Sequence, residues 1–600
     1  MCGLAAILNY SNNGSPVERD ELLKIRDAMV TRGPDAAGLW LSADRRVGLA
    51  HRRLSIIDLS EAGSQPMATP DGILRITYNG EIYNYKALRV ELEKKGYRFF
   101  SNSDTEVLLY LYLEMGQSMV QRLRGMYAIA LWDERNRSLF LARDPFGIKP
   151  LYVADNGKSL KVASQVTALL RGADVDTTAE PAGHVGFMLW GNVPEPYTLY
   201  KGIRAVPAGS SVLVDENGTF KSQRFFNLPA EIIQAERSAE SHESRQGTPS
   251  LNEILTDSVR HHLVADVPVG VFLSSGLDST TLTALASEVA SNGLHSVTLG
   301  FSEYKGLAND ETPFAERIAR QYGTLHQTKW VSKADFLEDY ERLMTVMDQP
   351  SVDGVNTYFV SKITKSTGLK VAISGLGGDE IFAGYPSFRQ IPVLVSRLAP
   401  ASYVPFIGKV FRWLSVPVVK HLTSPKYAGL LEYGGTFSGA YLLRRGLFMP
   451  WELPNVLESE LVREGWRELQ PLLRLEETVQ GIGSARLKVS ALELSWYMRN
   501  QLLRDSDWAG MAHSLEIRLP LVDIELWRKL LPLLLTKQPP GKVDMARLPR
   551  KALPQELLER RKTGFSIPVR DWLLQGDQSR YAARGLRAWA LTVYRKLCKY

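Results

Sequence analysis

The sequence has very little cysteine. Only Cys2 and Cys598 occur among 600 residues, which excludes a disulfide framework and a cysteine-rich zinc site. The nine histidines form no HExxH or CxxC…H pattern, so we do not expect a His/Cys metal centre.

Long apolar runs are also missing. A membrane-spanning helix needs about 18 consecutive apolar residues, and the nearest candidate, residues 391–422, is interrupted by Arg397, Lys409, Arg412 and Lys420. The chain does not begin with the basic segment that is typical of a secretory signal. We therefore expect a cytoplasmic protein without stable membrane insertion.

A strong charge of one sign is absent too. Lys and Arg number 72 and Asp and Glu number 65, so the formal net charge is +7 and gives no indication of nucleic-acid binding. Hydrophobic residues at 44% and charged residues at 23% exclude a disordered, collagen-like or coiled-coil chain. At about 100–200 residues per domain, the length predicts several domains.

The residues that are present follow two patterns. The first 225 residues contain many predicted strands and few helices, which is typical of stacked antiparallel sheets. One of these strands, Leu74 to Tyr78, ends at Asn79-Gly80, a pair that signals a turn. Residues 226–250 are mostly polar and predict a solvated linker.

From Leu251 onward, strands alternate with helices. The predicted strands at 267–273, 295–301 and 370–374 are separated by helical segments, which predicts a parallel α/β sheet. After about Pro386 the pattern is mostly helical, and residues 386–481 contain no motif that we can interpret.

The cysteine at position 2 is the first candidate for chemistry. Removal of Met1 would leave Cys2 with a free α-amine, which can act as a base for the thiol, as in N-terminal-nucleophile hydrolases. By itself, a cysteine at this position is usually only a small residue. Its interpretation depends on the residues that accompany it.

Three further patterns in the first half have suitable chemistry. Arg53, on an otherwise apolar strand, can clamp a carboxylate with two hydrogen bonds. Asn79 and Gly80 can hold a developing oxyanion, and Asp104 can receive a substrate ammonium. Each also has a structural interpretation: a surface ion pair for Arg53, a hairpin turn for Asn79-Gly80 and a helix cap for Asp104.

Two glycine-rich segments in the second half follow predicted strands. The first, residues 274–279 (SSGLDS), has the pattern of an anion cradle, although it lacks the lysine and the spacing of a Walker A loop. Asp278 inside such a loop indicates Mg²⁺. The second segment, residues 374–380 (SGLGGDE), follows another strand end, where α/β proteins bind ligands. The alternative is two βα turns with capping acids.

In their order along the chain, these motifs resemble the glutamine-hydrolysing asparagine synthetase family. The class II glutamine amidotransferase part of the resemblance rests on Cys2-Gly3 and on residues 32–35, 51–55, 78–84, 103–104 and 143–147. The ATP pyrophosphatase part rests on residues 274–279, 374–380, 511–520 and 560–565. The resemblance covers nearly the whole chain.

The resemblance implies a multidomain α/β fold. Residues 2–225 would form an αββα four-layer N-terminal-nucleophile hydrolase domain, and residues 226–250 would link it to the second domain. Residues 251–600 would form a parallel-sheet α/β ATP pyrophosphatase domain, similar to adenine nucleotide alpha hydrolases, with a mostly helical extension.

In the glutaminase half, the resemblance implies that Cys2 attacks the glutamine side-chain amide while Asn79 and Gly80 form the oxyanion hole. Arg53 would bind the glutamine carboxylate, and Asp104, helped by Glu81, would hold the ammonium group. The same site would include Leu54, Ser55, Ile56 and Ile57. Ammonia would then travel inside the protein to the second site.

In the synthetase half, the resemblance implies that ATP binds along two strand ends, at Leu273, Ser274, Ser275, Gly276, Asp278, Ser279, Leu299, Ser374 and Gly375. Asp278 and Asp379 would hold Mg²⁺, and Lys562 would stabilise the leaving pyrophosphate. Two positions depart from the family pattern: Ser275 replaces a glycine, with little expected effect, and Leu376 replaces an acidic residue. In the family that acid helps ammonia attack the acyl-adenylate, so either Asp379 or Glu380 takes its place here or the acceptor differs from aspartate.

The leading hypothesis is an asparagine synthetase that converts aspartate, ATP and glutamine into asparagine, AMP, pyrophosphate and glutamate. The main alternative amidates another carboxylate, such as a sugar uronic acid in surface-polysaccharide synthesis or a secondary metabolite. A third hypothesis is a non-catalytic binding protein. The presence together of Cys2, Asp278, Asp379 and Lys562 argues against it. The expected partners are small-molecule substrates; a homodimer is compatible with the sequence, and nucleic acid is not expected.

Overall fold

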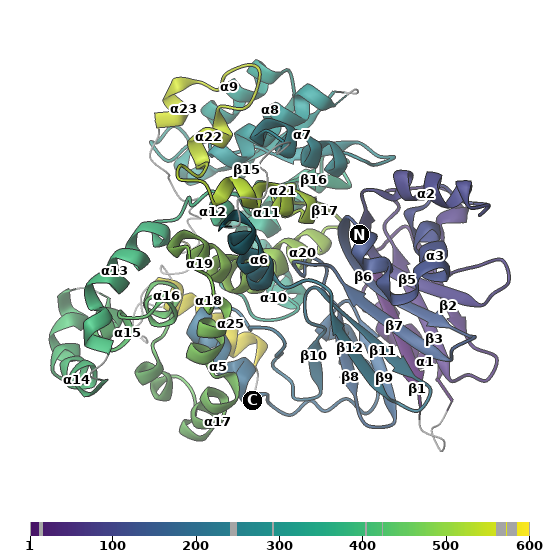
Figure 1. Ribbon diagram of the computed structural model, residues 1–600, viewed down its shortest axis with the longest axis horizontal. Helices are drawn as coiled ribbons and strands as arrows, with labels where there is room; N and C mark the ends of the chain where they lie inside the picture. Colours follow the sequence, from purple (N-terminus) through teal and green to yellow (C-terminus); the bar gives the residue numbers. More distant parts are fainter. Residues whose placement is uncertain are drawn as a thin grey trace.

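The computed structural model describes residues 2–10, 16–240, 249–290, 293–402, 405–422, 424–559, 572 and 585–598. Two antiparallel sheets lie face to face in the first half of the chain, and a parallel sheet lies in the second half (Figure 1). Helices of residues 387–479, which lie in sequence between two strands of the parallel sheet, gather at the lower left of Figure 1.

The first half is a sandwich of two six-stranded sheets. In spatial order, one sheet contains β10 (Ile203–Ala205), β8 (Tyr152–Asp155), β9 (Ser159–Ala163), β1 (Gly3–Asn9), β3 (Val47–Arg53) and β2 (Ala36–Leu41). The other contains β12 (Phe220–Arg224), β11 (Ser210–Asp215), β7 (Ser138–Arg143), β6 (Gly125–Asp133), β5 (Leu74–Ile82) and β4 (Met67–Ala68). Alternate side chains of β1 and β6 fill the space between the sheets, among them Leu4, Ala6, Leu8, Ala128, Ala130 and Trp132.

Helices cover both outer faces of this sandwich. Apolar side chains of α1 (Arg19–Asp27) and α4 (Val166–Leu169) pack on the first sheet. Side chains of α2 (Tyr85–Lys94) and α3 (Asp104–Met115) pack on the second. The result is the four-layer αββα arrangement that the resemblance implies.

The second half is built on a five-stranded parallel sheet, which confirms the expected α/β pattern. Its strands, in spatial order, are β15 (Leu325–Val331), β14 (His295–Phe301), β13 (Val269–Phe272), β16 (Val371–Ile373) and β17 (Glu516–Arg518). The helices of this half are α7 (Leu251–His262), α8 (Leu277–Val289), α9 (Thr312–Tyr322), α10 (Lys333–Val346), α11 (Val355–Lys365), α12 (Gly378–Ile381), α20 (Arg504–Met511), α21 (Ile524–Leu534), α22 (Lys542–Ala546) and α23 (Gln555–Glu559).

Most of the residues between β16 and β17 form a helical layer, in agreement with the mostly helical pattern expected after about Pro386. Its members are α13 (Ser387–Ser402), α14 (Pro405–Leu422), α15 (Leu430–Tyr433), α16 (Phe437–Arg445), α17 (Ser459–Leu469), α18 (Pro471–Val479), α19 (Ala485–Leu492), a π-helix (Glu493–Leu503) and α25 (Leu586–Leu597). Among the described residues, no helix is both long and apolar enough to cross a membrane.

One helix of the first half joins this layer. Helix α5 (Pro181–Trp190) packs so closely on α17 that a Cβ at Gly465 would lie 2.2 Å from the carbonyl oxygen of Pro181. His184 of α5 also pairs with Tyr594 of α25, with Nδ1 and the hydroxyl 2.7 Å apart. The two halves therefore share one continuous interior.

The solvated linker expected at 226–250 is wrong for its first part, which forms helix α6 (Leu228–Glu240). Leu228 and Ile232 are buried in the apolar cluster that includes α21. Glu236 accepts hydrogen bonds from the backbone N–H groups of Gly483 and Ser484, each at 2.8 Å. Tertiary packing on one apolar face therefore stabilises a helix that the polar composition concealed.

The turn expected at Asn79-Gly80 is also wrong. Both residues lie inside β5, where Asn79 faces Ala128 and Gly80 faces Tyr127 across the antiparallel pair with β6. A Cβ at Gly80 would lie 2.1 Å from the carbonyl oxygen of Met126, so the glycine permits a close backbone approach instead of a turn.

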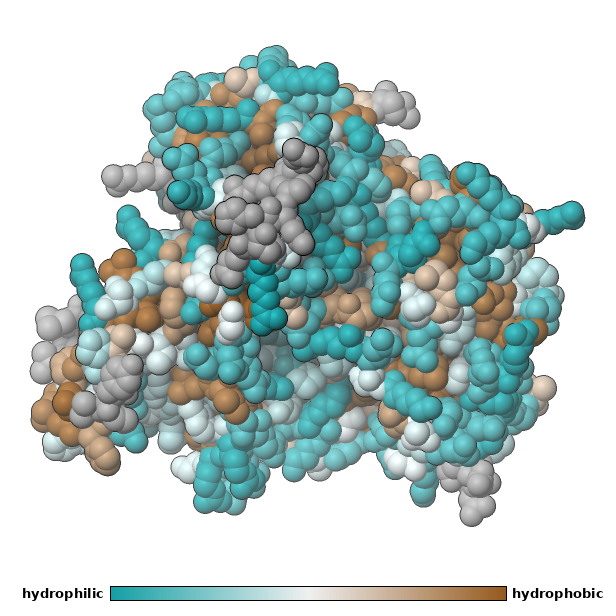
Figure 2. All heavy atoms as spheres, in the orientation of Figure 1, coloured by the Kyte–Doolittle hydropathy of each residue, from teal (hydrophilic) through white to brown (hydrophobic). Residues whose placement is uncertain are grey.

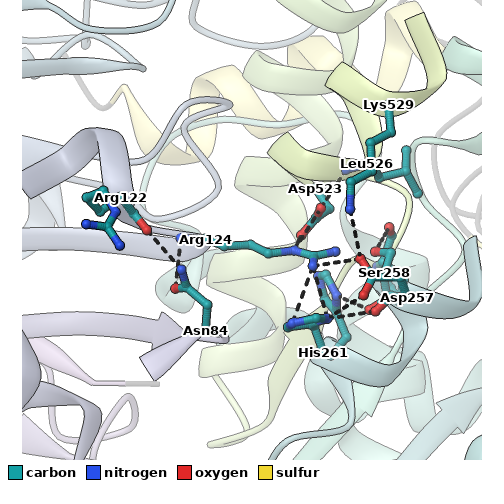
Figure 3. Close-up of polar contacts among 11 residues, drawn as sticks. Asn84, Arg122, Arg124, Asp257, Ser258, His261, Asp523, Leu526 and Lys529 are labelled. Carbon is teal, nitrogen blue, oxygen red and sulfur yellow. Dashed lines mark hydrogen bonds and ion pairs between the residues drawn. The ribbon is translucent and has the colours of Figure 1, made fainter. Parts of the chain in front are cut away.

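An arginine next to β6 joins the halves from another side. Figure 3 shows Arg124 reaching from the first half to α7 and to the start of α21. Its Nε lies 2.9 Å from Oδ2 of Asp523, and its Nη1 lies 2.8 Å from Oδ2 of Asp257. Both contacts fix how the antiparallel sandwich sits against the parallel sheet.

Candidate active sites

Cys2 lies just before β1, against Asn79 of β5 in the facing sheet. Its backbone N–H donates to Oδ1 of Asn79 at 3.0 Å, and its thiol faces the carbonyl oxygen of Leu54 at 3.9 Å. Only 8% of Cys2 is exposed, and burial raises the pKa of its thiol. The structure thus brings together a buried thiol, an amide side chain and the segment that follows Arg53.

Arg53 stands at the end of β3 and holds this segment in shape. Its guanidinium donates to the carbonyl oxygens of Ser60 at 2.7 Å, Ile57 at 3.3 Å and Asp58. The intervening Leu54, Ile56 and Ile57 are buried. The backbone N–H of Ser55 donates to Asp35 at 2.9 Å. The expected contact of Arg53 with a glutamine carboxylate stays a prediction.

The two acidic residues expected at this site have different surroundings. Oδ2 of Asp104 accepts from the hydroxyl of Tyr78 at 2.8 Å and from the backbone N–H of Ile82 at 2.9 Å. The side chain that caps α3 belongs to Ser103. Glu81 faces the second half instead, with Oε2 3.5 Å from Nη2 of Arg518, and burial raises its pKa.

A cavity of about 470 Å³ opens at the carboxyl ends of β13, β14 and β16. All but one of the residues expected to contact ATP line it: Leu273, Ser274, Gly276, Asp278, Ser279, Leu299, Ser374 and Gly375. Ser275 lines a neighbouring cavity of about 810 Å³. The parallel sheet therefore brings the predicted nucleotide residues to one place.

The loop between β13 and α8 is held by its own hydroxyl groups. Ser274 and Ser279 approach to 2.8 Å through their Oγ atoms, and the backbone N–H of Gly276 donates to Oγ of Ser274 at 3.1 Å. The second glycine-rich segment lies directly against it, since a Cβ at Gly375 would lie 2.8 Å from Cβ of Asp278. Small residues are required where the two segments meet.

Asp278 and Asp379 converge on a residue that the sequence analysis missed. The ammonium of Lys542, on α22, lies 2.7 Å from Oδ1 of Asp379 and also pairs with Oδ2 of Asp278. Burial acts to lower the pKa of Lys542, but the attraction of both carboxylates outweighs it and raises the pKa. No local motif signals this lysine, which lies 264 residues from Asp278. The expected Lys562 lies outside the described residues.

The donor chemistry at this point suits Mg²⁺. Two carboxylates from separate strand ends approach one position at the cavity wall, and Mg²⁺ commonly binds through one or two carboxylates together with substrate phosphates. Within the described ranges, no group of three or more His, Cys, Asp or Glu residues could hold a metal ion. A metal here would therefore depend on oxygen ligands from the nucleotide.

Three further acidic residues, Asp353, Glu380 and Asp505, line the same cavity. Oε1 of Glu380 accepts from the hydroxyl of Tyr385 at 2.9 Å, and burial raises the pKa of Glu380 to about 7. Asp353 and Asp505 also line the cavity, and burial raises the pKa of Asp505 to about 7. Leu376 contributes an apolar side chain to the same wall. The lining residues that the structure describes include no Lys, Arg or His.

Two family models match the chain in succession. A model described as a glutamine amidotransferase domain matches residues 1–226, and one described as asparagine synthase matches residues 250–597. Both ranges agree with the order of motifs along the sequence.

Similar proteins extend over most of the chain. Asparagine synthetase [glutamine-hydrolyzing] 1 of Bacillus subtilis is 32% identical over 581 residues, which cover 96% of this chain and 88% of that protein. A putative asparagine synthetase of Mycobacterium tuberculosis is 32% identical over 625 residues, covering 97% of this chain and 90% of that protein. An amidase of Gibberella zeae is 31% identical, covering 65% of this chain and 60% of that protein.

Among solved structures, a glutamine phosphoribosylpyrophosphate amidotransferase from B. subtilis matches 56% of this chain and 92% of its own, with 15% identity and a TM-score of 0.29. The two family models and the relatives of nearly full length agree with the resemblance seen in the sequence. The chain therefore belongs to the asparagine synthase family and is an ATP-dependent amidating enzyme with an N-terminal glutamine amidotransferase domain.

Proposed function

We propose that this chain is a glutamine-dependent asparagine synthetase that works through two separate sites. One site would release ammonia from glutamine, and the other would adenylate the side-chain carboxylate of aspartate for attack by that ammonia. The observation that supports this most strongly is the convergence of Asp278 and Asp379 at a cavity lined by the predicted nucleotide residues, in a chain that also places Cys2 against Asn79.

At the glutaminase site, the Cys2 thiolate would attack the side-chain carbonyl carbon of glutamine. The thiol proton would pass through the free α-amine to the departing nitrogen, so that ammonia leaves and a glutamyl thioester remains. Asn79 and Gly80 would donate to the oxyanion during both attack and hydrolysis. Water would then release glutamate. Burial of Cys2 favours the neutral thiol at rest, so deprotonation would accompany substrate binding.

At the synthetase site, an aspartate carboxylate oxygen would attack the α-phosphorus of ATP and pyrophosphate would leave. Ser274, Gly276 and Ser279 of the loop line the cavity, and their hydroxyl and backbone N–H groups, which now bond to one another, would turn to the phosphates. When bound, Mg²⁺ would neutralise phosphate charge next to Asp278 and Asp379. The ammonium of Lys542 already lies between these carboxylates. From there it would contact the phosphates and stabilise their negative charge during the reaction. Ammonia would finally displace AMP from the acyl-adenylate.

The direct test is aspartate-dependent formation of AMP by the purified protein with ATP, Mg²⁺ and glutamine, with asparagine measured in the same sample. Equal amounts of AMP and asparagine are expected. Release of glutamate without aspartate-dependent AMP would contradict aspartate as the acceptor, while keeping the glutaminase half of the proposal.

The acidity of the cavity favours a second candidate, a different carboxylate acceptor. Aspartate retains its α-ammonium and α-carboxylate while the side chain reacts. Asp353, Glu380 and Asp505 would suit the ammonium, but the described lining includes no basic residue to pair with the carboxylate. A sugar uronic acid would suit this lining better, because its hydroxyl groups can donate to carboxylates. AMP formation that depends on a uronic acid and not on aspartate would select this candidate.

A further inference from the structure

Helix α14 exposes a stripe of large apolar side chains. The exposed fractions are 80% for Phe406, 77% for Trp413, 61% for Leu414, 55% for Ile407 and 53% for Val410. These positions recur at helical spacing and lie on one side of α14. Figure 2 shows hydrophobic residues gathered at the left end of the molecule, where Figure 1 places α14. We call these five residues the α14 stripe.

The other side of α14 is fixed against the protein. A Cβ at Gly408 would lie 2.6 Å from Cα of Glu432, so the helix backbone touches α15 at this point. Nε of Arg412 donates to Oε2 of Glu432 at 2.6 Å, and its guanidinium lies 4.8 Å from the ring of Trp451. The helix therefore presents its small and polar side inward and its apolar side to solvent, which is the reverse of an ordinary surface helix.

The surroundings of the stripe are basic in sequence. Residues 381–431 contain no Asp or Glu but six basic residues: Arg389, Arg397, Lys409, Arg412, Lys420 and Lys426. Arg389, Arg397 and Lys409 are exposed. Glu432 lies on the inward side of α14 and pairs with Arg412, so the exposed cations Arg389, Arg397 and Lys409 set the charge of the surroundings. An apolar stripe of Phe, Trp and Leu with exposed cations nearby is the composition of helices that lie in the interface of an anionic membrane.

We propose that α14 docks this protein on the surface of an anionic lipid bilayer. The α14 stripe would enter the boundary between headgroups and acyl chains, and the neighbouring cations would contact lipid phosphates. This placement is peripheral, in keeping with the finding that no described helix can cross a membrane. The proposal does not depend on the acceptor of the amidation reaction.

Charge also favours a bilayer over a second copy of the chain. A twofold contact through the stripe would bring the exposed cations Arg389, Arg397 and Lys409 of two copies together, and the one acid described beside α14, Glu432, is already paired with Arg412. An anionic bilayer meets the same cations with opposite charge, and it covers apolar side chains without requiring a complementary shape.

The test is co-sedimentation of the full-length protein with vesicles of equal parts phosphatidylcholine and phosphatidylglycerol, compared with phosphatidylcholine alone. The variant Phe406→Ser/Trp413→Ser removes the two most exposed members of the stripe without adding charge. The control Val90→Ser/Leu307→Ser removes apolar residues that are 50% and 61% exposed outside α14. Equal glutaminase activity without vesicles verifies that each variant is folded.

We expect the wild type to bind the anionic vesicles, more weakly at high salt and on neutral vesicles. The α14 variant should lose about tenfold or more in vesicle affinity, while the control keeps it. Absence of vesicle binding by the wild type, or equal loss in both variants, would overturn the proposal. A wild-type dimer that the α14 variant dissolves, without vesicle binding, would instead assign the stripe to self-association.

Discussion

Arg32 and Asp507 form a two-point ion pair across the boundary between the two halves of the chain. Nη1 of Arg32 lies 2.6 Å from Oδ2 of Asp507, and Nη2 lies 3.0 Å from Oδ1. The third guanidinium donor, Nε, binds the carbonyl oxygen of Cys2 at 3.1 Å. One buried side chain thus connects the backbone of Cys2, the proposed nucleophile, to α20 of the second half.

We predict that Asp507→Asn weakens this connection. The side chains are 0% and 5% exposed, so loss of one charge leaves a buried cation and should lower the free energy of unfolding by about 3–5 kcal/mol. Urea denaturation measures this change. The exposed pair of Arg463 and Glu460 is the control, and Glu460→Gln should leave stability unchanged. Similar effects of both substitutions would contradict the assigned role of Arg32 and Asp507.

Lys542→Met should separate the role of this lysine from that of a metal. Without the ammonium, Asp278 and Asp379 repel each other in a partly buried place, so we expect a lower melting temperature. Because Mg²⁺ could then replace the lost charge, its addition should raise the melting temperature of the variant more than that of the wild type. AMP formation should fall about a hundredfold or more.

The control for this lysine is Lys551→Met, at an exposed position where Nζ donates to the carbonyl oxygen of Gln321 at 2.7 Å. It should change neither the Mg²⁺ response nor AMP formation. An unchanged Mg²⁺ response in Lys542→Met would show that the two carboxylates do not share one cation position.

Glu380 should make stability depend on pH. Burial raises its folded pKa from 4.5 to about 7, so between these values the unfolded chain loses a proton that the folded chain keeps. The free energy of unfolding therefore falls as pH rises from about 4.5 to about 7, and Glu380 accounts for about 3 kcal/mol of that fall. Glu380→Gln should remove that part of the slope, measured as urea midpoints against pH. A slope identical to that of the wild type would contradict burial of a protonated Glu380.

Gly80→Ala should destabilise the glutaminase half. The new Cβ would lie 2.1 Å from the carbonyl oxygen of Met126 and 2.7 Å from Cα of Tyr127, so β5 and β6 must separate. We expect a loss of about 1–3 kcal/mol or more in thermal unfolding, together with lower glutaminase activity. Gly483→Ala is the control, since its nearest contact would be an ordinary 3.5 Å. Equal stability of the two variants would contradict the close approach.

The local sequence was sufficient to predict where the candidate nucleotide-binding segments lie. The alternation of strands and helices predicted that residues 274–279 and 374–380 follow parallel strands, and the cavity at those strand ends confirms that they lie together. This succeeds because parallel strands place their carboxyl ends at one edge of the sheet. The roles of the individual residues remain predictions.

Features that depend on tertiary contacts were harder to predict. Asn79-Gly80 has the local signal of a turn, but pairing with β6 extends the strand through both residues. The polar composition around α6 concealed the few apolar residues that dock it. Arg32 and Asp507 are 475 residues apart, and Lys542 lies far from both carboxylates that it joins. No local sequence pattern predicts pairings between residues so far apart in the chain.

The central claim, that separate sites release and use ammonia, is tested most directly with Cys2→Ala. AMP formation in the presence of the acceptor is measured with glutamine and then with ammonium chloride as the nitrogen source. We predict that the variant loses glutamine-dependent product but keeps ammonia-dependent amidation, while Cys598→Ser retains both. Loss of both activities in a folded Cys2→Ala protein, or retention of glutamine-dependent product, would contradict the two-site account.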